Sequence, residues 1–321
     1  MKDMRLYLRN SFLPMAMSAF LAMGCSDKLT GTDEAGGVPV TFSTGMTRAA
    51  VDANKDGMES FLVWGGFDSQ NNLFNAETVT PAGHYQGTRY WVSDAVHNFY
   101  ALHPASLKDK ASCADDGVIT VTDFDTSQKR GTEAIDLMTA RQTGISYKVE
   151  NPPSPVDLTF SHELSRVRFT ISTDAKVTIT GVKLWGVAYK GDFTSNSTTP
   201  WSNLTRASQD DTPFSQPDDF ELEANGKRHL LAGTYDAAND NYGDLLFIPQ
   251  SIDESVIFSM TWIYDNGTSR TVNVSLPQVG PALWEKGKSY HYQATIPSPT
   301  TNITFTVTIT DWNDQRIDAD L

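Results

Sequence analysis

Positive charge is scarce in this chain of 321 residues, which carries 25 lysines and arginines against 39 aspartates and glutamates. Its formal net charge is therefore −14 at pH 7. Such a surface repels the phosphate backbone of nucleic acids and anionic lipid headgroups. The composition therefore argues against nucleic acid as a partner.

Sequence motifs for catalysis and metal binding are missing as well. The chain contains no G-x-S-x-G, P-loop, G-x-G-x-x-G or C-x-x-C motif, and its six histidines are scattered outside any H-E-x-x-H pattern. His97 and His103 lie on one face of an expected strand, and His162-Glu163 falls between two strands, so structural roles explain them more simply than a metal site. We expect no enzyme, metal or cofactor. A secreted hydrolase is the least favoured alternative, because it would require a clustered pair of acids.

Long hydrophobic segments are also absent, since no stretch beyond the first residues approaches the 18 apolar residues expected of a transmembrane helix. The main apolar run, residues 12–23, follows the basic residues Lys2, Arg5 and Arg9. It is too short to cross a bilayer and is typical of a secretory signal peptide. We therefore expect residues 1–24 to be a signal peptide that is removed.

Cysteine occurs only twice, as Cys25 and Cys113. Cys25 stands directly after the expected cleavage point, where its thiol can be alkylated by diacylglycerol. The run of residues 21–25 is similar to a bacterial lipobox, with Leu21 four residues before the cysteine and Ala22 where leucine is usual. Several acyl chains on Cys25 would hold the protein stably on a membrane. Cys113 would then have no partner, so we expect no intrachain disulfide and a fold that depends on its hydrophobic core.

A short strand is expected soon after this cysteine. Residues 26–37 are polar and contain glycines, which indicates a flexible tether. Val38, Val40 and Phe42 then alternate with other residues in the pattern of a half-buried strand. Because Pro39 cannot donate a hydrogen bond to a neighbouring strand, we expect an edge strand, and an edge strand at a terminus can be removed.

The rest of the chain consists of many short strand-like stretches separated by glycine, asparagine, aspartate and proline. The expected strands cover residues 61–64, 90–102, 118–124, 145–149, 156–160, 166–171, 177–180, 182–187, 245–248, 256–264, 271–276, 290–296 and 303–312. Asp265-Asn266-Gly267 predicts a hairpin turn. Residues 132–140 suggest one short helix, and a long polar insertion covers residues 190–227.

The proline-rich segment from Glu150 to Pro155 provides the clearest boundary, because consecutive prolines favour an extended connector. Many short strands with almost no helix predict an all-β protein with two antiparallel β-sandwich domains in tandem. Residues 49–151 would form the N-terminal sandwich and residues 156–321 the C-terminal one.

Aromatic residues are frequent, with seven tryptophans and 11 tyrosines. Most of them lie in expected strands, where core packing accounts for them. Trp201 and Trp284 fall in expected loops and are candidates for contact with an external partner. They keep open one reading of the chain as a surface-anchored carbohydrate-binding lipoprotein.

Several motifs together resemble the fimbrillin-like family of Bacteroides-type bacteria, the subunits of lipoprotein-derived type V pili. The matching motifs are Cys25 and residues 40–42, 47–49, 99–101, 136–140, 158–162, 246–250, 284–290 and 309–312. The resemblance implies two transthyretin-like sandwiches and a location at the cell outer membrane and in the fimbrium. It implies other fimbrial subunits as partners, through β-strand addition, and a ligand on a host or bacterial surface.

The same resemblance implies proteolytic maturation of a lipidated precursor by a trypsin-like or Arg-specific protease. The matching bond joins Arg48 to Ala49, so residues 25–48 would be a propeptide that includes the strand from Val38 to Phe42. The emptied groove would accept a strand from another subunit. Family shaft subunits carry a C-terminal donor extension, whereas only Asn313 to Leu321 follow Trp312 here. This difference implies either a tip or accessory subunit that accepts a strand without donating one, or a last strand that detaches on assembly.

Overall fold

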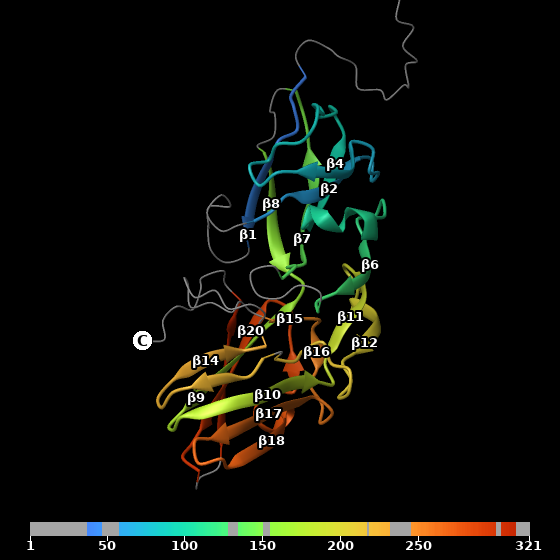
Figure 1. Ribbon diagram of the computed structural model, residues 1–321. Coiled ribbons are helices and arrows are strands. Elements are labelled where there is room, and N and C mark those ends of the chain that lie inside the picture. The colour runs from blue at the N-terminus through green and yellow to red at the C-terminus, as the bar shows by residue number, and fades with distance from the viewer. Residues whose placement is uncertain are drawn as a thin grey trace, which may run out of the picture.

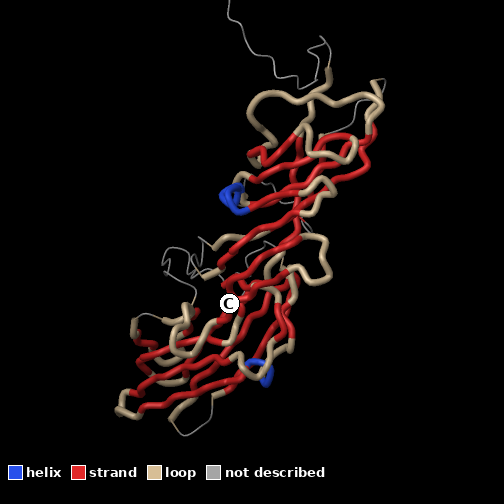
Figure 2. The backbone as a smooth tube through the Cα atoms, turned by 90° about the vertical axis from the view of Figure 1, so that its right-hand side faces the viewer, coloured by secondary structure: helices blue, strands red, loops and turns tan. Residues whose placement is uncertain are grey.

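The computed structural model describes residues 37–46, 58–127, 134–149, 155–216, 218–231, 245–299 and 303–312. Strands dominate these ranges and form two lobes stacked end to end (Figure 1). In the perpendicular view, short 3-10 helices interrupt the strands once in each lobe of the described chain (Figure 2); they are η1 (Ala105–Lys110) and η3 (Leu276–Gln278). The described protein is all-β, as the sequence predicts. No helix within it is long and apolar enough to span a bilayer.

The N-terminal lobe contains two sheets. Among the described residues, the larger has the order β1 (Phe42–Met46), β8 (Val156–His162), β7 (Met138–Ser146), β4 (Val96–His103), β2 (Phe61–Phe67) and β3 (Phe74–Val79). The smaller has the order β12 (Trp201–Arg206), β11 (Ala188–Thr194), β6 (Ile119–Asp125) and β5 (Ala111–Cys113). Strand β1 pairs parallel to β8, and the other neighbours are antiparallel. Strand β1 is therefore an edge strand.

The C-terminal lobe also packs two principal sheets. In the described chain, one has the order β13 (Phe220–Leu222), β10 (Val177–Trp185), β17 (Ile257–Tyr264) and β18 (Ser269–Ser275). The other has the order β14 (Lys227–Leu230), β9 (Ser165–Thr173), β20 (Lys288–Ile296) and β21 (Thr304–Asp311), and β15 (Leu245–Phe247) also pairs with β9. Strands β16 (Gln250–Ser251) and β19 (Leu283–Trp284) form a small separate ladder. Strands β9 and β20 run parallel.

Alternation of side chains explains the C-terminal core. In β17, Phe258, Met260 and Trp262 are buried, while the residues between them are only partly covered. Successive side chains of a strand point to opposite faces, so one face of β17 fills the space between the two sheets and the other faces outward.

Strand β2 is buried on both faces instead. Phe61 and Val63 join a core on one side of the large sheet, whereas Leu62 and Trp64 join a second core against β6 and β11. Trp312 also belongs to this second core, so apolar packing continues from one lobe into the other. A run that is apolar at every position fits this arrangement, because neither face of the strand meets water.

The boundary expected at the proline-rich segment does not separate the two lobes. Strand β8 follows that segment but completes the N-terminal sheet, and the chain passes to the C-terminal lobe only after Glu163. The chain then returns, because β11 and β12, from the expected polar insertion, complete the second N-terminal sheet. Each lobe is therefore built from segments that are far apart in the sequence.

The helix expected at residues 132–140 is wrong over the residues that the structure describes. Residues 134–137 have no regular structure, and residues 138–140 begin β7. Met138 and Ala140 are buried on one face of that strand while Thr139 points to the other. A period of two thus fits these residues better than the helical period.

His97 and His103 of β4 are buried. The hydrogen bonds of His103 fit the neutral form of its imidazole ring. The Nδ1–H group of His103 donates to the Asp136 carbonyl at 3.0 Å, and its Nε2 accepts the Glu59 amide at 3.3 Å. Burial lowers the pKa of His103 below its ordinary value, and burial lowers the pKa of His97 as well. Protonation of His103 at Nε2 would break its bond to Glu59.

We expect the free energy of unfolding to fall as the pH drops below about 6.5, because the unfolded chain then binds protons that buried His97 and His103 do not. Each histidine contributes up to about 1.4 kcal/mol per pH unit until the pH passes its lowered pKa. Urea unfolding at a series of pH values from about 7.5 to about 5 gives the free energy of unfolding at each pH, and hence its slope against pH. His103→Gln should flatten it. A slope equal to that of the unchanged protein would contradict this assignment.

Candidate functional site

The first candidate site is the groove that residues 38–46 occupy, called here the seat of β1. Backbone hydrogen bonds hold this segment from two sides. Phe42 to Met46 pair in parallel with Val156 to Phe160 of β8 at the sheet edge (Figure 1). Just before, the Val40 amide donates to the Arg89 carbonyl at 2.8 Å, and the Trp91 amide donates to the Val38 carbonyl at 3.0 Å. The regular strand thus begins at Phe42, four residues later than the expected start at Val38.

Side chains anchor this segment in the N-terminal core. Val40 and Phe42 are only 1% and 6% exposed, and Val38 is half-buried against the same cluster. The Phe42 ring lies edge-on to Phe74 at 5.2 Å and to Phe99 at 5.7 Å between ring centroids. Such edge-to-face pairs add about 0.5–1.5 kcal/mol to the gain from burial. The seat is therefore a set of aromatic pockets along an open sheet edge.

A turn also lies directly against β1. The Thr44 hydroxyl donates to the Pro81 carbonyl at 3.1 Å. Gly83 has a φ of +81°, and a Cβ there would lie 2.3 Å from the Phe42 carbonyl oxygen. Only glycine fits this close approach, so the backbone of the turn and the backbone of β1 are closely matched.

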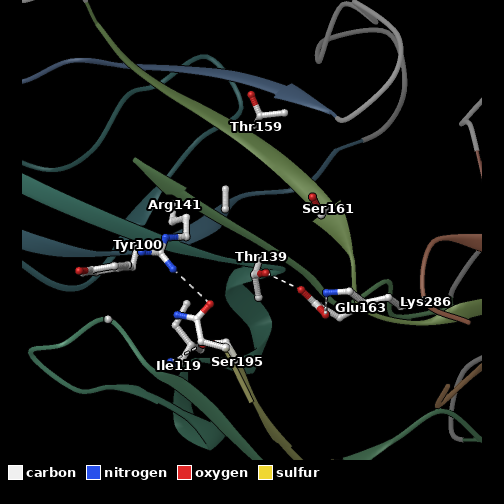
Figure 3. Close-up of a pocket in the computed structure, with 12 residues that line it drawn as sticks. Tyr100, Ile119, Thr139, Arg141, Thr159, Ser161, Glu163, Ser195 and Lys286 are labelled. Atoms are coloured by element: carbon white, nitrogen blue, oxygen red, sulfur yellow. Dashed lines mark hydrogen bonds and ion pairs between the residues drawn. The ribbon is translucent and has the colours of Figure 1, made fainter. Parts of the chain in front are cut away.

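The second candidate site is a cavity of about 240 Å³ beside β7 and β8 (Figure 3). Arg141 and Thr139 of β7 and Thr159 and Ser161 of β8 line it, while Lys286 reaches it from the C-terminal lobe. It also includes Tyr100, Gly117, Ile119, Ala140, Glu163, Ser195 and Asn196. The lining is therefore mainly polar and draws on both lobes.

A buried carboxylate links the two lobes at this cavity. The side chain of Glu163 is 7% exposed, and its two oxygens accept hydrogen bonds from the Thr139 hydroxyl at 2.7 Å and from Lys286 Nζ at 2.9 Å. Glu163 is the cavity's carboxylate, since the rest of the lining contains no acid. The cavity thus lacks the pair of acidic side chains that glycoside hydrolysis requires.

A second polar group lies beside Glu163. His162 Nδ1 is 2.7 Å from an Asp136 carboxylate oxygen, and its ring stacks on Trp312 with a centroid separation of 3.9 Å. These contacts fit the expected structural role of His162-Glu163. Sequence reasoning missed Asp136 and Lys286 as their partners, because each lies in a different segment of the chain.

The two tryptophans proposed for external contact take different positions. Trp284 is 0% exposed in β19, where its Nε1–H group donates to the Tyr292 hydroxyl at 3.0 Å. The expectation that Trp284 lies in a loop and faces a partner is therefore wrong. Trp201 begins β12 and is half-buried against Phe124 and Phe193.

The expected lipidation and processing residues, Cys25, Arg48 and Ala49, lie outside the described residues. So do Asn313 to Leu321, on which the tip or accessory role rests. Within the described ranges, no group of three or more histidines, cysteines, aspartates or glutamates is arranged to hold a metal ion.

Comparison with known proteins gives one sequence match and several structural ones. Residues 47–312 match the sequence model of a family described as fimbrillin-like. A fimbrial protein from Bacteroides vulgatus ATCC 8482 has 16% identity and a TM-score of 0.58, and the match covers 86% of this chain and 99% of that one. No curated protein matches the chain.

Two candidate cell adhesion proteins share the fold to a similar degree. The protein from Bacteroides uniformis ATCC 8492 has 17% identity and a TM-score of 0.50, with 86% of this chain and 99% of that chain covered. The protein from Bacteroides ovatus ATCC 8483 has 15% identity and a TM-score of 0.51, with 86% and 98% covered. At such low identity these matches show a common fold.

Proposed function

Since the chain belongs to the fimbrillin-like family, we propose that it is a structural and adhesive subunit of a cell-surface pilus. Its precursor is anchored to the outer membrane through lipid on Cys25 and is cleaved between Arg48 and Ala49. Cleavage releases residues 25–48, and another fimbrial subunit supplies the strand that replaces them. The proposal includes a tip or accessory position and transthyretin-like sandwiches as the two lobes.

The observation that carries the proposal is the seat of β1. The strand is at the sheet edge, so its removal breaks backbone hydrogen bonds on one side of β8 and leaves the rest of that sheet paired. Removal also empties the pockets that Val40 and Phe42 fill. Unpaired backbone groups next to empty apolar pockets favour the addition of another strand.

The free-energy scale of this exchange is large compared with the stability of a domain. Burial of Val40 and of Phe42 is worth about 1.5–3 kcal/mol each, whereas a domain is stable by about 5–15 kcal/mol. A cleaved subunit is thus strongly destabilised until an incoming strand with apolar side chains at alternate positions restores the lost burial.

Intact-mass analysis and N-terminal sequencing of the protein sheared from the native cell surface test this proposal. We expect the polymeric fraction to begin at Ala49. Arg48→Ala should keep the N-terminal segment and prevent polymerisation, while Lys55→Ala, a nearby basic residue, should mature normally. An acylated start at Cys25 on every copy would refute strand removal and indicate a permanently anchored lipoprotein.

A further inference from the structure

Arg141 is the cation of the cavity beside β7 and β8 that is not paired with an acid. Its Nη1 donates to the Asn196 side-chain oxygen at 3.2 Å. Arg141 forms no ion pair with a carboxylate of the described residues. A guanidinium has five N–H donors in a planar fork that matches a carboxylate. Arg141 is exposed, so its remaining donors face solvent and are accessible to a ligand.

The other charges at the cavity compensate one another. Lys286 and Glu163 form a direct ion pair, and Thr139 donates to the same carboxylate. Figure 3 shows Arg141 apart from this pair, with Thr139 between them in that view. The net charge that remains in the cavity is the positive charge of Arg141, in a protein whose overall charge is −14.

Hydroxyl groups complete the polar surface. Thr159 and Ser161 of β8 are both in the cavity lining, and their side chains make no hydrogen bond with any described residue. The Ser195 hydroxyl accepts the Ile119 amide at 2.8 Å and retains its own proton to donate. Each of these groups can pair with a hydroxyl of a ligand.

We propose that this cavity binds an acidic sugar, whose carboxylate pairs with Arg141 and whose hydroxyls bond to Thr159, Ser161 and Ser195. A volume of about 240 Å³ is slightly below the range of about 300–1,000 Å³ usual for ligand sites, which favours a single small ligand. A phosphate group carries more negative charge than this one cation offsets. A neutral sugar would leave the guanidinium without its partner.

The inference goes beyond assembly by strand exchange. No residue of β1 lines the cavity, but Gly45 of β1 pairs with Thr159 of β8, so sugar binding is tested on the uncleaved chain, in which this ladder is intact. Failure of maturation at Arg48 would leave the sugar site unaffected, and failure of sugar binding would leave the assembly proposal unaffected.

The test is a calorimetric titration of the purified protein with glucuronic acid, N-acetylneuraminic acid and glucose. We expect saturable binding of at least one acidic sugar and at least tenfold weaker binding of glucose. Arg141→Gln should lower the affinity for the acidic sugar at least tenfold. Arg270→Gln, which removes the same charge from an exposed site on β18, should not change the affinity.

Chemical-shift mapping of backbone amides provides an independent readout, with changes expected at Thr159 and Ser161. Absence of saturable binding by both acidic sugars would overturn the proposal. Equal affinity for glucose, or an affinity unaffected by Arg141→Gln, would overturn it as well. Acetate that binds as tightly as glucuronic acid would refute the sugar part and leave a simple carboxylate site.

Discussion

A chain that begins at Ala49 is expected to unfold at a lower temperature than the longer chain and to bind a synthetic peptide of residues 37–46. Loss of the burial of Val40 and Phe42 costs several kcal/mol. For a domain of this size each kcal/mol lowers Tm by about 2–4 °C, so a fall on the order of 10 °C is expected. Thermal unfolding with and without the peptide measures both effects.

The peptide should restore most of the lost stability, because it regains the β8 ladder and the aromatic pockets around Phe42. A matched peptide with serine in place of Val40 and Phe42 keeps the length and backbone and should have little effect. Exposed Ser43 offers a control position, where alanine should not weaken the peptide. A truncated protein with an unchanged Tm and no affinity for the peptide would count against strand exchange.

Trp284→Ala is expected to destabilise the C-terminal lobe by about 3–5 kcal/mol. The indole is fully buried and lies 5.1 Å from the Phe247 ring between centroids. Its removal leaves a large cavity and deprives the buried Tyr292 hydroxyl of its donor. Both effects act in the same direction, because a cavity and an unpaired buried polar group each cost free energy.

The matched comparison is Trp201→Ala. Trp201 is half-buried on β12 at the edge of its sheet, so we expect a loss near the average for single substitutions, about 1 kcal/mol. Urea unfolding followed by circular dichroism compares the two variants at equal m-value. Equal losses would show that Trp284 is less important to the core than its burial indicates.

Local patterns in the sequence predict individual strands well where alternation is regular. The alternating residues of β17 lie as expected, and the hairpin at Asp265-Asn266-Gly267 forms, with Gly267 at a φ of +80°. Val40 and Phe42 are buried, in agreement with their spacing, and β1, which begins at Phe42, lies at an edge of the sheet. These features depend on neighbours that are close in the chain.

Partnership between distant segments was not predictable from such patterns. Nothing local in β8, β11 or β12 indicates that they complete the N-terminal lobe, because strand pairing is decided by which long-range ladders bury the most apolar surface. The polar cavity illustrates the same limit. Arg141 of β7, Glu163 after β8 and Lys286 between β19 and β20 come from three separate segments, and their arrangement follows only from the complete topology.

The parallel pairing of β9 with β20 sets the order in which the C-terminal lobe can fold. Arg166 and Ser289 meet across this pair although 123 residues separate them. Closing so long a loop costs entropy before any contact is gained, and folds rich in such distant contacts form slowly. The central ladder of this lobe cannot close until β20 is available to β9, so the strands between them must wait for a distant segment before this lobe is complete.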